Sequence, residues 1–444
     1  MTDETNSHFS DLRDKITSRN AHVGIVGLGY VGLPLAKTCV KNGYRVTGYD
    51  NNEEKIQTLQ SGQSPIKTFS GSWVKQKIEE GTFRPTNDPQ ELAETDVILI
   101  CVPTPLTDEQ TPDTSFIEGA GKLVRDQLTP GKLVILESTT YPGTTRDLLK
   151  PILEQSGLRA GENFYLAYSP EREDPGNEMY SVENIPKVVG GHDDLSQQLA
   201  TQFYQSVMVS IVPMNSTEEA EATKLMENIF RAANIALVNE MKQVLSEMDI
   251  DVWNVIRAAS TKPFGYMPFF PGPGVGGHCI PKDLYYMIWK AKENGLSMDF
   301  LEQAGRVNNA MPEVIAKKIA HTLKENGNDL QNVRGLLLGM AYKPDVDDVR
   351  ESPGLKIFHQ LEEFGISMAY HDPFVPSVPA SHQHARELQS VSPYPDVLSQ
   401  YDFVVVATDH STYDPTTILR HAHLVFDSRN LMNGVDGSEK VIPV

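Results

Sequence analysis

A glycine-rich turn near the start of the chain, Gly27-Leu-Gly-Tyr-Val-Gly32, restricts the possible folds more than any other segment. It stands between a buried strand predicted at His22–Val26 and a helix predicted at Val31–Asn42. In this context the first glycine permits a tight turn, the second lets the backbone approach a pyrophosphate, and the third lets helix and strand pack closely. The segment therefore predicts a dinucleotide-binding unit, and the alternative is a purely structural glycine turn.

The residue that ends the next predicted strand, Tyr44–Tyr49, indicates which dinucleotide is bound. This residue is Asp50, roughly the twenty residues beyond the turn that the dinucleotide pattern requires. A carboxylate there accepts hydrogen bonds from a ribose 2′-hydroxyl and repels a 2′-phosphate. We therefore expect NAD rather than NADP.

Short apolar segments after this unit alternate with helical or loop segments. They lie at Val97–Val102, Leu133–Leu136, Phe164–Tyr168 and Lys187–Gly190. Strands that alternate with crossover connections predict a parallel sheet covered on both faces.

The pattern changes at Val212 to a single long helix. Ser216-Thr-Glu-Glu219 has the spacing of a capping box. Apolar residues then recur at steps of three and four to about Glu247, starting with Leu225 and Ile229. This helix could join two domains or carry a subunit interface.

A second α/β pattern begins near Asn332. Strands are predicted at Gly335–Gly339, Ile366–Tyr370 and Phe403–Thr408, helices at Gly354–Phe364 and Pro395–Gln400, and a surface loop at Val375–Pro395. The predicted fold is α/β, with two Rossmann-like parallel-sheet domains joined by a long central helix and a helical segment. We predict an N-terminal extension at 1–20, a first sheet domain at 21–212, a helical segment at 213–325 and a second sheet domain at 326–444.

Charge and composition exclude several classes of function. Lys and Arg total 39 against 59 Asp and Glu, a net charge of −20, which disfavours wrapping by nucleic acid but permits a small anionic ligand held by a few local cations. The first twenty residues contain no apolar signal segment, and Val97–Val102 is too short to span a bilayer. Three cysteines cannot form a disulfide framework, so we expect a reducing, cytoplasmic compartment and no membrane partner.

A single cysteine, Cys279, lies in the glycine-rich loop Phe270–Asp283. Glycines let the backbone approach a ligand and leave the sulfur accessible, which favours a nucleophile over a buried structural thiol. A metal ligand is the third reading, but zinc requires further Cys or His ligands at typical spacing and His278 stands alone beside it. The twelve histidines show no such clustering, so no metal site is predicted.

Five polar residues are further candidates, each with an ordinary alternative. Lys224 and Asn228 share one helix face, which could also be a solvated polar face. Glu171 follows a predicted strand, where α/β enzymes gather active-site loops, but could be a surface acid. Lys343 and Arg350 could neutralise a diphosphate or pair with the surrounding aspartates.

Together these motifs resemble the nucleotide-sugar dehydrogenase family, the UDP-glucose/UDP-N-acetylhexosamine 6-dehydrogenases. The matching segments run in family order over Ala21–Asn430: Gly27–Pro34, Val102-Pro-Thr-Pro105, Glu137-Ser-Thr139, Ser169-Pro-Glu171, Lys224 with Asn228, Gly276–Cys279 with Asp283, and Lys343–Arg350. The segments Pro271–Pro281 and Ser169–Gly176 look like the N-acetylhexosamine branch, closest to UDP-N-acetylglucosamine 6-dehydrogenases.

The resemblance implies a four-electron oxidation of a sugar C6 hydroxyl to a carboxylate, with two NAD consumed. A water held by Asp283 and assisted by Lys224 takes the hydroxyl proton. The Cys279 thiolate then attacks the aldehyde, and the thiohemiacetal becomes a thioester that water hydrolyses with Glu171 as general base. Lys224 and Asn228 stabilise the oxyanion.

The resemblance also implies binding residues and partners. Thr139 positions water or cofactor, Thr104 lines the cofactor site, and the second sheet domain holds the uridine diphosphate. The cofactor contacts are then Gly27, Gly29, Tyr30, Val31, Gly32, Asp50, Thr104 and Thr139. The substrate contacts are Glu171, Arg172, Lys224, Asn228, Lys262, Gly276, Lys343 and Arg350. The long helix forms the interface of a homodimer or dimer-based oligomer, across which Lys262 reaches the partner's substrate.

Several alternatives remain at this point. The same reaction could act on UDP-glucose, UDP-N-acetylmannosamine or UDP-N-acetylgalactosamine. A two-electron hydroxy-acid-type dehydrogenase shares the glycine turn and the central helix but has no use for Cys279. A non-catalytic NAD or UDP-sugar sensor needs neither the thiol nor the lysine.

Overall fold

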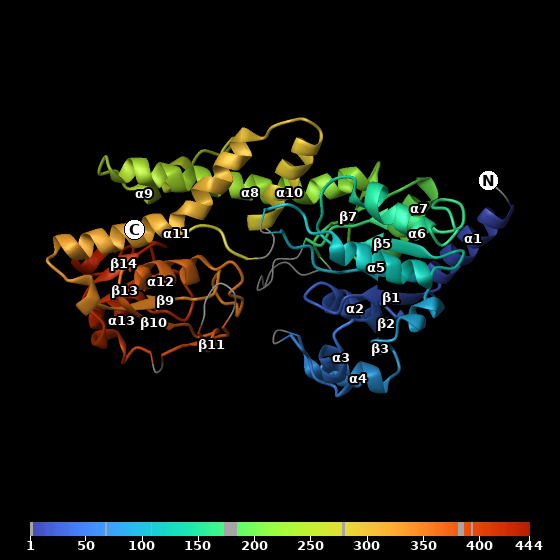
Figure 1. Cartoon of the computed structure of the whole chain (residues 1–444), viewed down its shortest axis with the longest axis horizontal. Coiled ribbons are helices and arrows are strands. Elements are labelled where there is room, and N and C mark those ends of the chain that lie inside the picture. Colours follow the sequence, from blue (N-terminus) through green and yellow to red (C-terminus); the bar gives the residue numbers. More distant parts are fainter. Residues whose placement is uncertain are drawn as a thin grey trace. The chain divides into compact units, whose positions relative to one another are not determined.

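The computed structural model describes residues 3–66, 69–107, 109–172, 184–277, 280–380, 386–391 and 394–444. The chain divides into two compact units, each built around one sheet flanked by helices (Figure 1). Unit 1 contains Met1–Glu227 and Tyr285–Gly295, and unit 2 contains Asn228–Leu284 and Leu296–Val444. The segment predicted as a helical domain, 213–325, therefore contributes to both units.

The sheet of unit 1 has the strand order β3-β2-β1-β4-β5-β6-β7-β8. Its strands are β1 (His22–Val26), β2 (Arg45–Tyr49), β3 (Phe83–Thr86), β4 (Val97–Ile100), β5 (Leu133–Leu136), β6 (Tyr165–Tyr168), β7 (Lys187–Gly191) and β8 (Ile211–Met214). Neighbouring strands are parallel except for β6 with β7. The order reverses between β1 and β4, so loops at the carboxyl ends of these strands form the crevice where α/β proteins bind ligands.

The predicted strands of unit 1 are confirmed, while β3 and β8 were not predicted. β3 contains a proline, and β8 has exposed residues at Val212 and Pro213, so neither shows the continuous apolar pattern of a buried strand. β8 also lies across the position where the sequence pattern was expected to change.

The helices of unit 1 include one formed by the predicted N-terminal extension. They are α1 (Asp3–Thr17), α2 (Gly32–Lys41), α3 (Glu53–Gln60), α4 (Gly71–Glu79), α5 (Ser115–Asp126), α6 (Lys150–Glu154) and α7 (Asp194–Gln205), with the 3-10 helix η1 (Pro89–Glu94) and the π-helix η2 (Thr144–Leu149). Leu12 and Ile16 of α1 are buried in the unit 1 core, and the Tyr44 hydroxyl donates to the Ile16 carbonyl over 3.1 Å. The extension thus packs on the sheet domain through a few apolar residues. Its mostly polar composition gave no indication of this packing.

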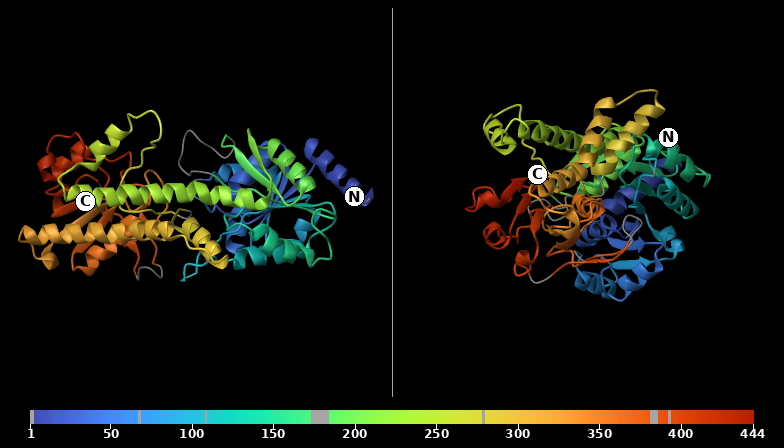
Figure 2. Two further views of the ribbon diagram at one scale, coloured as in Figure 1. Left: turned by 90° about the horizontal axis from the view of Figure 1, so that it is seen from above. Right: turned by 60° about the vertical axis from the view of Figure 1, so that its left-hand side comes forward.

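The long predicted helix is α8 (Thr217–Ser246), which begins in unit 1 and continues into unit 2 (Figure 2). Half of the expected capping box is present. The Ser216 hydroxyl accepts from the Glu219 amide at 3.2 Å, whereas the Glu219 carboxylate accepts from the Asn215 amide at 3.0 Å instead of the Ser216 amide. In unit 2, the Asn308 amide group donates to the Ala232 carbonyl of α8 over 2.9 Å.

Three further helices follow α8: α9 (Val252–Ala259), α10 (Ile280–Glu293) and α11 (Asp299–Glu325), the last of which carries Asn308. Among the described residues, no helix is both long and apolar enough to cross a membrane.

The sheet of unit 2 is parallel, with the order β10-β9-β13-β14-β15. Its strands are β9 (Arg334–Leu338), β10 (Ser367–His371), β13 (Phe403–Val406), β14 (Val425–Asp427) and β15 (Val441–Pro443). It is accompanied by α12 (Pro353–Glu363), α13 (Pro415–His421) and the single turns η3 (Leu330–Asn332), η4 (Leu398–Gln400) and η5 (Ser438–Lys440). The predicted two-sheet α/β fold is confirmed.

Two local predictions in unit 2 are wrong. The helix expected at Pro395–Gln400 is a run of turns that ends in the short 3-10 segment η4. The surface loop expected at Val375–Pro395 contains the antiparallel pair β11 (Ser377–Val378) and β12 (Leu388–Gln389). Val375, Val378 and Leu388 are buried in the unit 2 core, because burial of apolar surface outweighs the turn-forming tendency of the nearby prolines.

Candidate functional site

The glycine turn of unit 1 has the geometry that a dinucleotide requires. Gly27 has φ +100°, and a Cβ there would lie 2.6 Å from the Cys101 carbonyl oxygen. A Cβ on Gly32 would lie 1.9 Å from the Gly27 carbonyl oxygen. A Cβ on Gly29 would meet no atom within 4 Å, so open space faces the backbone at the start of α2. A pyrophosphate can therefore approach the helix N-terminus at this point.

Asp50 lies at the end of β2 and holds the glycine turn. Its side chain is buried, and Oδ2 accepts a hydrogen bond from the Leu28 amide at 2.9 Å. Lys55 donates to the same oxygen over 2.5 Å, a partner that sequence reasoning missed. Oδ1 accepts from the Asn52 amide at 3.0 Å and retains a lone pair, so the ribose role of Asp50 stays a prediction.

The loops after β4 and β5 are joined at the two predicted threonines. Thr104 donates from Oγ1 to the Thr139 carbonyl over 2.6 Å, and Ser138 donates to the Val102 carbonyl over 2.6 Å. Thr104 is buried, and its own carbonyl accepts from the hydroxyl of Tyr286 on α10. The structure thus brings Thr104 and Thr139 together at the carboxyl edge of the sheet.

Glu221 on α8 fastens the same β5 loop at its other end. Its buried carboxylate accepts from the Gly143 amide at 2.5 Å, the Thr145 amide at 2.9 Å and the Thr145 hydroxyl at 2.7 Å. Burial raises the pKa of Glu221 to about 7. Sequence reasoning missed this residue, although an acid one turn before Lys224 was an available signal.

The part of α10 that belongs to unit 1 packs on the β5 loop as well. The rings of Tyr141 and Trp289 lie 4.7 Å apart, and the Lys290 ammonium lies 5.2 Å from the Tyr141 ring. With the Tyr286–Thr104 hydrogen bond, these contacts fix the helix that begins directly after Cys279.

Glu171 borders a small hollow next to the glycine turn. The hollow is lined by Val31, Leu35, Glu137, Glu171, Arg172, Ile185, Pro186 and Lys187. At its base a buried ion pair joins Lys187 to Glu137 over 2.6 Å, and the Tyr204 hydroxyl donates to the same carboxylate. Burial raises the pKa values of Glu137 and Tyr204.

Two other predicted contact residues of unit 1 are Arg172, which is predicted to bind substrate, and Tyr30, which is predicted to bind the cofactor. Arg172 is bound by Glu227 of α8 at 2.5 Å and donates to the Pro186 carbonyl over 2.5 Å, so its guanidinium is already paired. Tyr30, within the glycine turn, is 49% exposed.

Lys224, Asn228 and Asp283 are all buried, with exposed fractions of 6%, 8% and 2%. The alternative of a solvated helix face for Lys224 and Asn228 is therefore wrong, because neighbouring segments cover that face. In unit 2, Asn228 donates from Nδ2 to Oδ2 of Asp283 over 2.5 Å. Cys279 and His278, between the glycine loop and α10, lie outside the described residues.

The glycine loop that leads to Cys279 packs on the loop that follows β9. The Gly277 amide donates to the Arg350 carbonyl over 2.9 Å. A Cβ on Gly276 would lie 2.7 Å from the Tyr342 Cβ, and Gly277 has φ +85° with the Tyr342 ring 2.8 Å from its Cβ position. These glycines are required because no side chain fits between the two loops.

Two of the three predicted cations of unit 2, Lys343 and Arg350, belong to this second loop. Arg350 forms a two-pronged ion pair with Asp348, with its Nη2 2.6 Å and its Nε 3.0 Å from the carboxylate, so the pairing with aspartate that the sequence left open occurs. Lys343 has its ammonium 5.9 Å from the Tyr342 ring. Lys262 follows α9, is exposed, and lies 5.1 Å from the Phe264 ring.

Arg429, after β14, is a further cation that sequence reasoning missed. It donates from Nε to the Ala407 carbonyl over 3.0 Å, and its Nη1 would lie 2.7 Å from a Cβ on Gly272. Its guanidinium therefore contacts the glycine loop directly. The described residues contain no group of three or more His, Cys, Asp and Glu side chains that could hold a metal ion.

Family models match most of this chain. The NAD binding domain of the UDP-glucose/GDP-mannose dehydrogenase family matches residues 21–208, its central domain matches 218–310, and its UDP binding domain matches 336–434. The chain belongs to the UDP-glucose/GDP-mannose dehydrogenase family. NAD is its cofactor, and the open space at Gly29 fits that assignment.

Individual members of the UDP-glucose/GDP-mannose dehydrogenase family are about one-third identical to the chain. UDP-N-acetyl-D-mannosamine dehydrogenase of Pyrococcus horikoshii is 32% identical over 417 residues, covering 92% of this chain and 96% of that protein. UDP-N-acetyl-D-glucosamine 6-dehydrogenase of Pseudomonas aeruginosa is 33% identical over 397 residues, covering 89% and 92%. A solved structure of the UDP-D-ManNAc dehydrogenase from Pyrococcus horikoshii has a TM-score of 0.84 at 32% identity, covering 93% of this chain and 96% of that one.

Proposed function

We propose that the chain oxidises the C6 hydroxyl of a UDP-N-acetylhexosamine to the uronic acid, with UDP-N-acetylglucosamine as the first candidate substrate. The main support is the buried Asn228–Asp283 hydrogen bond on the two helices that carry the predicted oxyanion and water-holding groups. UDP-N-acetylmannosamine is the second candidate, because relatives of similar identity carry the names of both enzymes.

The proposed reaction assigns one task to each residue. NAD, when bound, takes up hydride in both oxidations. Asp283 holds the water that receives the proton of the C6 hydroxyl. The Cys279 thiolate then bonds to the aldehyde carbon, and oxidation of the thiohemiacetal gives a thioester. Water hydrolyses the thioester with Glu171 as base, which returns the thiolate.

The remaining buried polar groups stabilise charge. The Lys224 ammonium and the Asn228 amide donate to the oxygen that becomes negative when sulfur adds to the aldehyde. Both side chains are buried, so their hydrogen bonds act where water competes weakly. Lys343 and Arg350 are proposed to neutralise the diphosphate. The Arg350–Asp348 pair must then open or share its donors.

We also propose that the enzyme is a homodimer. Four apolar residues of α8 in unit 2 and one residue just beyond its end form one exposed stripe: Phe230, Leu237, Met241, Val244 and Met248 are between 41% and 60% exposed. Their spacing places them along one side of the helix, a pattern typical of an interface. Sedimentation equilibrium of the wild type and of Leu237→Glu tests this, because a charge in the stripe should give monomers.

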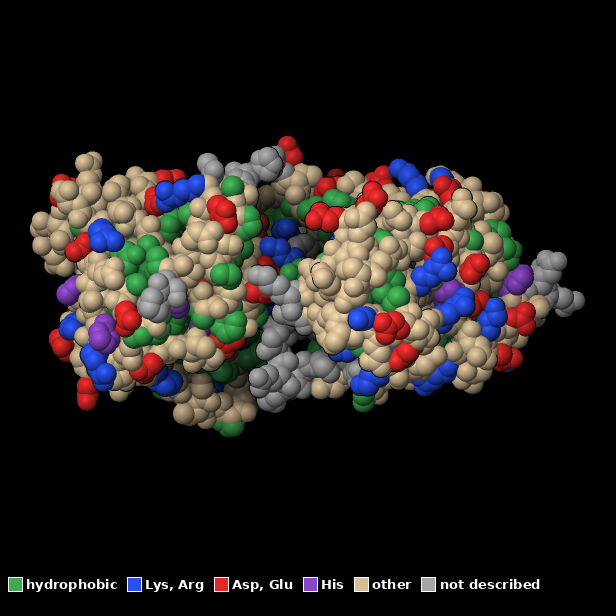
Figure 3. Space-filling model, turned by 90° about the horizontal axis from the view of Figure 1, so that it is seen from below, with side chains coloured by type: hydrophobic (Ala, Val, Ile, Leu, Met, Phe, Trp, Pro, Cys, Tyr) green, Lys and Arg blue, Asp and Glu red, His purple; other side chains and the backbone are tan. Residues whose placement is uncertain are grey.

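We further propose that the protein works in a reducing, cytoplasmic compartment and does not bind nucleic acid. Cys39 and Cys101 are buried free thiols, as expected for a cytoplasmic protein. Figure 3 shows acidic and basic side chains interspersed over the visible face of each unit, without the continuous basic surface that a polyanion needs.

The test of the function is the NADH yield per mole of four sugars: UDP-N-acetylglucosamine, UDP-N-acetylmannosamine, UDP-N-acetylgalactosamine and UDP-glucose. Two NADH and a uronic acid from an N-acetylhexosamine support the proposal. One NADH with a released carbonyl product would indicate the two-electron alternative. Binding without turnover of any sugar would indicate a sensor.

A further inference from the structure

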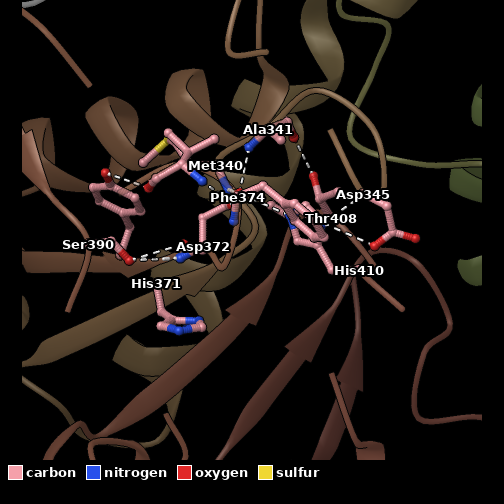
Figure 4. A network of polar contacts seen from close by, with 12 residues as sticks. Met340, Ala341, Asp345, His371, Asp372, Phe374, Ser390, Thr408 and His410 are labelled. Atoms are coloured by element: carbon pink, nitrogen blue, oxygen red, sulfur yellow. Dashed lines mark hydrogen bonds and ion pairs between the residues drawn. The ribbon is translucent and has the colours of Figure 1, made fainter. Parts of the chain in front are cut away.

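Asp372, the residue after β10, anchors the start of the loop that follows β9 (Figure 4). Its side chain is fully buried, and Oδ2 accepts hydrogen bonds from the Met340 amide at 2.7 Å and the Ala341 amide at 2.8 Å. Oδ1 accepts from the Phe374 amide at 2.8 Å and the Val375 amide at 3.0 Å. Burial acts against the charged form, but the hydrogen bond from His410, with those from the Ala341 and Phe374 amides, lowers the pKa of Asp372.

His410 connects this carboxylate to the middle of the same loop. Its ring is fully buried; Nε2 lies 2.9 Å from Oδ2 of Asp372, and Nδ1 accepts from the Asp345 amide at 3.0 Å. Because a backbone amide can only donate, Nδ1 is the acceptor and the proton is on Nε2. His410 therefore bridges an acid and a backbone donor as a neutral ring.

Additional contacts hold the loop around Lys343. The Thr408 hydroxyl donates to the Ala341 carbonyl over 2.6 Å, and the Ser411 amide donates to Oδ1 of Asp345 over 2.9 Å. Asp345 has φ +60°, a left-handed conformation that aspartate adopts more readily than most non-glycine residues, and these contacts support it. Lys343 lies between the held positions Ala341 and Asp345 in the chain.

Each sheet has an aspartate directly after its second strand in chain order, Asp50 after β2 and Asp372 after β10. The two carboxylates differ in their hydrogen-bond donors. Asp50 of unit 1 accepts from the Leu28 amide of its glycine turn, as Asp372 accepts from the Met340 amide. Five donors surround Asp372, which exceeds the roughly four acceptor positions of a carboxylate and leaves none for a ribose. Asp372 is thus used to hold the loop and His410.

We propose that His410 is a positioning residue for uridine diphosphate: its Nδ1 holds the Asp345 amide so that the Lys343 loop is set for the diphosphate. This inference rests on the proposed function of unit 2. It predicts that the bond from Nδ1 to the loop, rather than the bond from Nε2 to Asp372, controls nucleotide affinity.

Two substitutions separate these bonds. In His410→Asn the side-chain oxygen can replace Nδ1 and accept from Asp345, while the donor to Asp372 is lost. In His410→Gln the side-chain amide can replace Nε2 and donate to Asp372, while the acceptor for Asp345 is lost. Tyr413→Phe is the matched control, since it removes a buried hydroxyl that bonds to His371 and leaves both ring nitrogens of His410 with their partners.

The measurement is titration calorimetry with UDP alone, together with NAD binding, thermal unfolding and the steady-state constants for the preferred UDP-sugar. We expect UDP affinity to fall about tenfold in His410→Gln, with a matching rise in KM and kcat within about twofold. His410→Asn and Tyr413→Phe should stay within about threefold of the wild type in UDP affinity, and NAD binding should not change.

Two results would overturn the inference. Equal UDP affinity in His410→Gln and the wild type would show that the histidine is only structural, as would affinity losses that follow the melting temperature across all three variants. A wild-type protein that does not bind UDP would overturn the proposed function of unit 2 and the inference with it.

Discussion

Asn228 of α8 and Asp283 of α10 are joined by a hydrogen bond of 2.5 Å between two buried side chains 55 positions apart in the chain. The amide nitrogen donates and the Asp283 carboxylate accepts, which orients the Asp283 side chain. An oriented, buried carboxylate suits the proposed role of holding the water that receives a proton.

Asp283→Asn should lower kcat by at least about 100-fold, because general base catalysis contributes about 10² to 10⁴ in rate. UDP and NAD affinities should change less than about threefold. Steady-state kinetics and calorimetry measure these quantities, and Glu293→Gln at the exposed end of α10 is the control. A kcat within tenfold of the wild type would remove Asp283 from the proton transfer.

Cys279→Ala should abolish formation of the uronic acid and leave NAD binding intact, because the proposed second oxidation needs the bond between the thiolate and the aldehyde carbon. Product analysis by mass spectrometry with an NAD titration tests this. Cys39→Ala is the control, since burial raises the pKa of the Cys39 thiol and disfavours its thiolate. Carboxylate produced at the normal rate by Cys279→Ala would exclude the covalent mechanism.

Glu221 should make folding stability depend on pH. Its pKa is about 7 in the folded protein against an ordinary value of 4.5, so between these values the folded state binds the proton more strongly than the unfolded state. The contribution of Glu221 to stability is therefore greatest below about pH 4.5 and declines by about 3 kcal/mol as the pH rises to about 7.

Urea unfolding of the wild type and Glu221→Gln at pH 5 and pH 7.5 measures this effect. When the pH rises from 5 to 7.5, the free energy of unfolding of the wild type should fall relative to that of Glu221→Gln. Glu219→Gln, two residues away on the exposed side of α8, should show no such shift. An unchanged difference for Glu221→Gln would contradict the raised pKa.

Substitutions at two glycines of the unit 1 turn should have different effects, one on NAD affinity and the other on the stability of unit 1. Gly29→Ala places a methyl group in open space, so the melting temperature should stay within about 2 °C while NAD affinity falls about tenfold or more. Gly32→Ala places a Cβ 1.9 Å from a backbone oxygen and should destabilise unit 1 strongly.

Gly119→Ala in α5 meets no atom within 4 Å and serves as the control for both measurements. Differential scanning calorimetry and NAD titration check the pair. Unaltered NAD affinity in Gly29→Ala would show that the dinucleotide does not approach this turn.

Much of the fold could be predicted because its signals are local. The strand β4, the helix α8 and the Gly27 turn follow from apolar periodicity and glycine positions within about ten residues. The strands β3 and β8 and the pair β11–β12 were missed because each is defined by hydrogen bonds to a strand outside its own short segment of sequence. Whether the Lys224 side chain is buried or faces solvent was open as well, because the segments that cover it are remote in sequence.

The sequence by itself determined the two sheets, the NAD turn, the family and the candidate residues from Lys224 to Arg350, because each rests on residue types and spacings. Only the tertiary structure decided which of these side chains are buried and which groups form hydrogen bonds with them. Glu221 meets Gly143 across 78 positions, and His410 meets Asp345 across 65. Such contacts depend on the packing of whole sheets and helices, because a side chain's burial and partners are set by segments that no short sequence window contains.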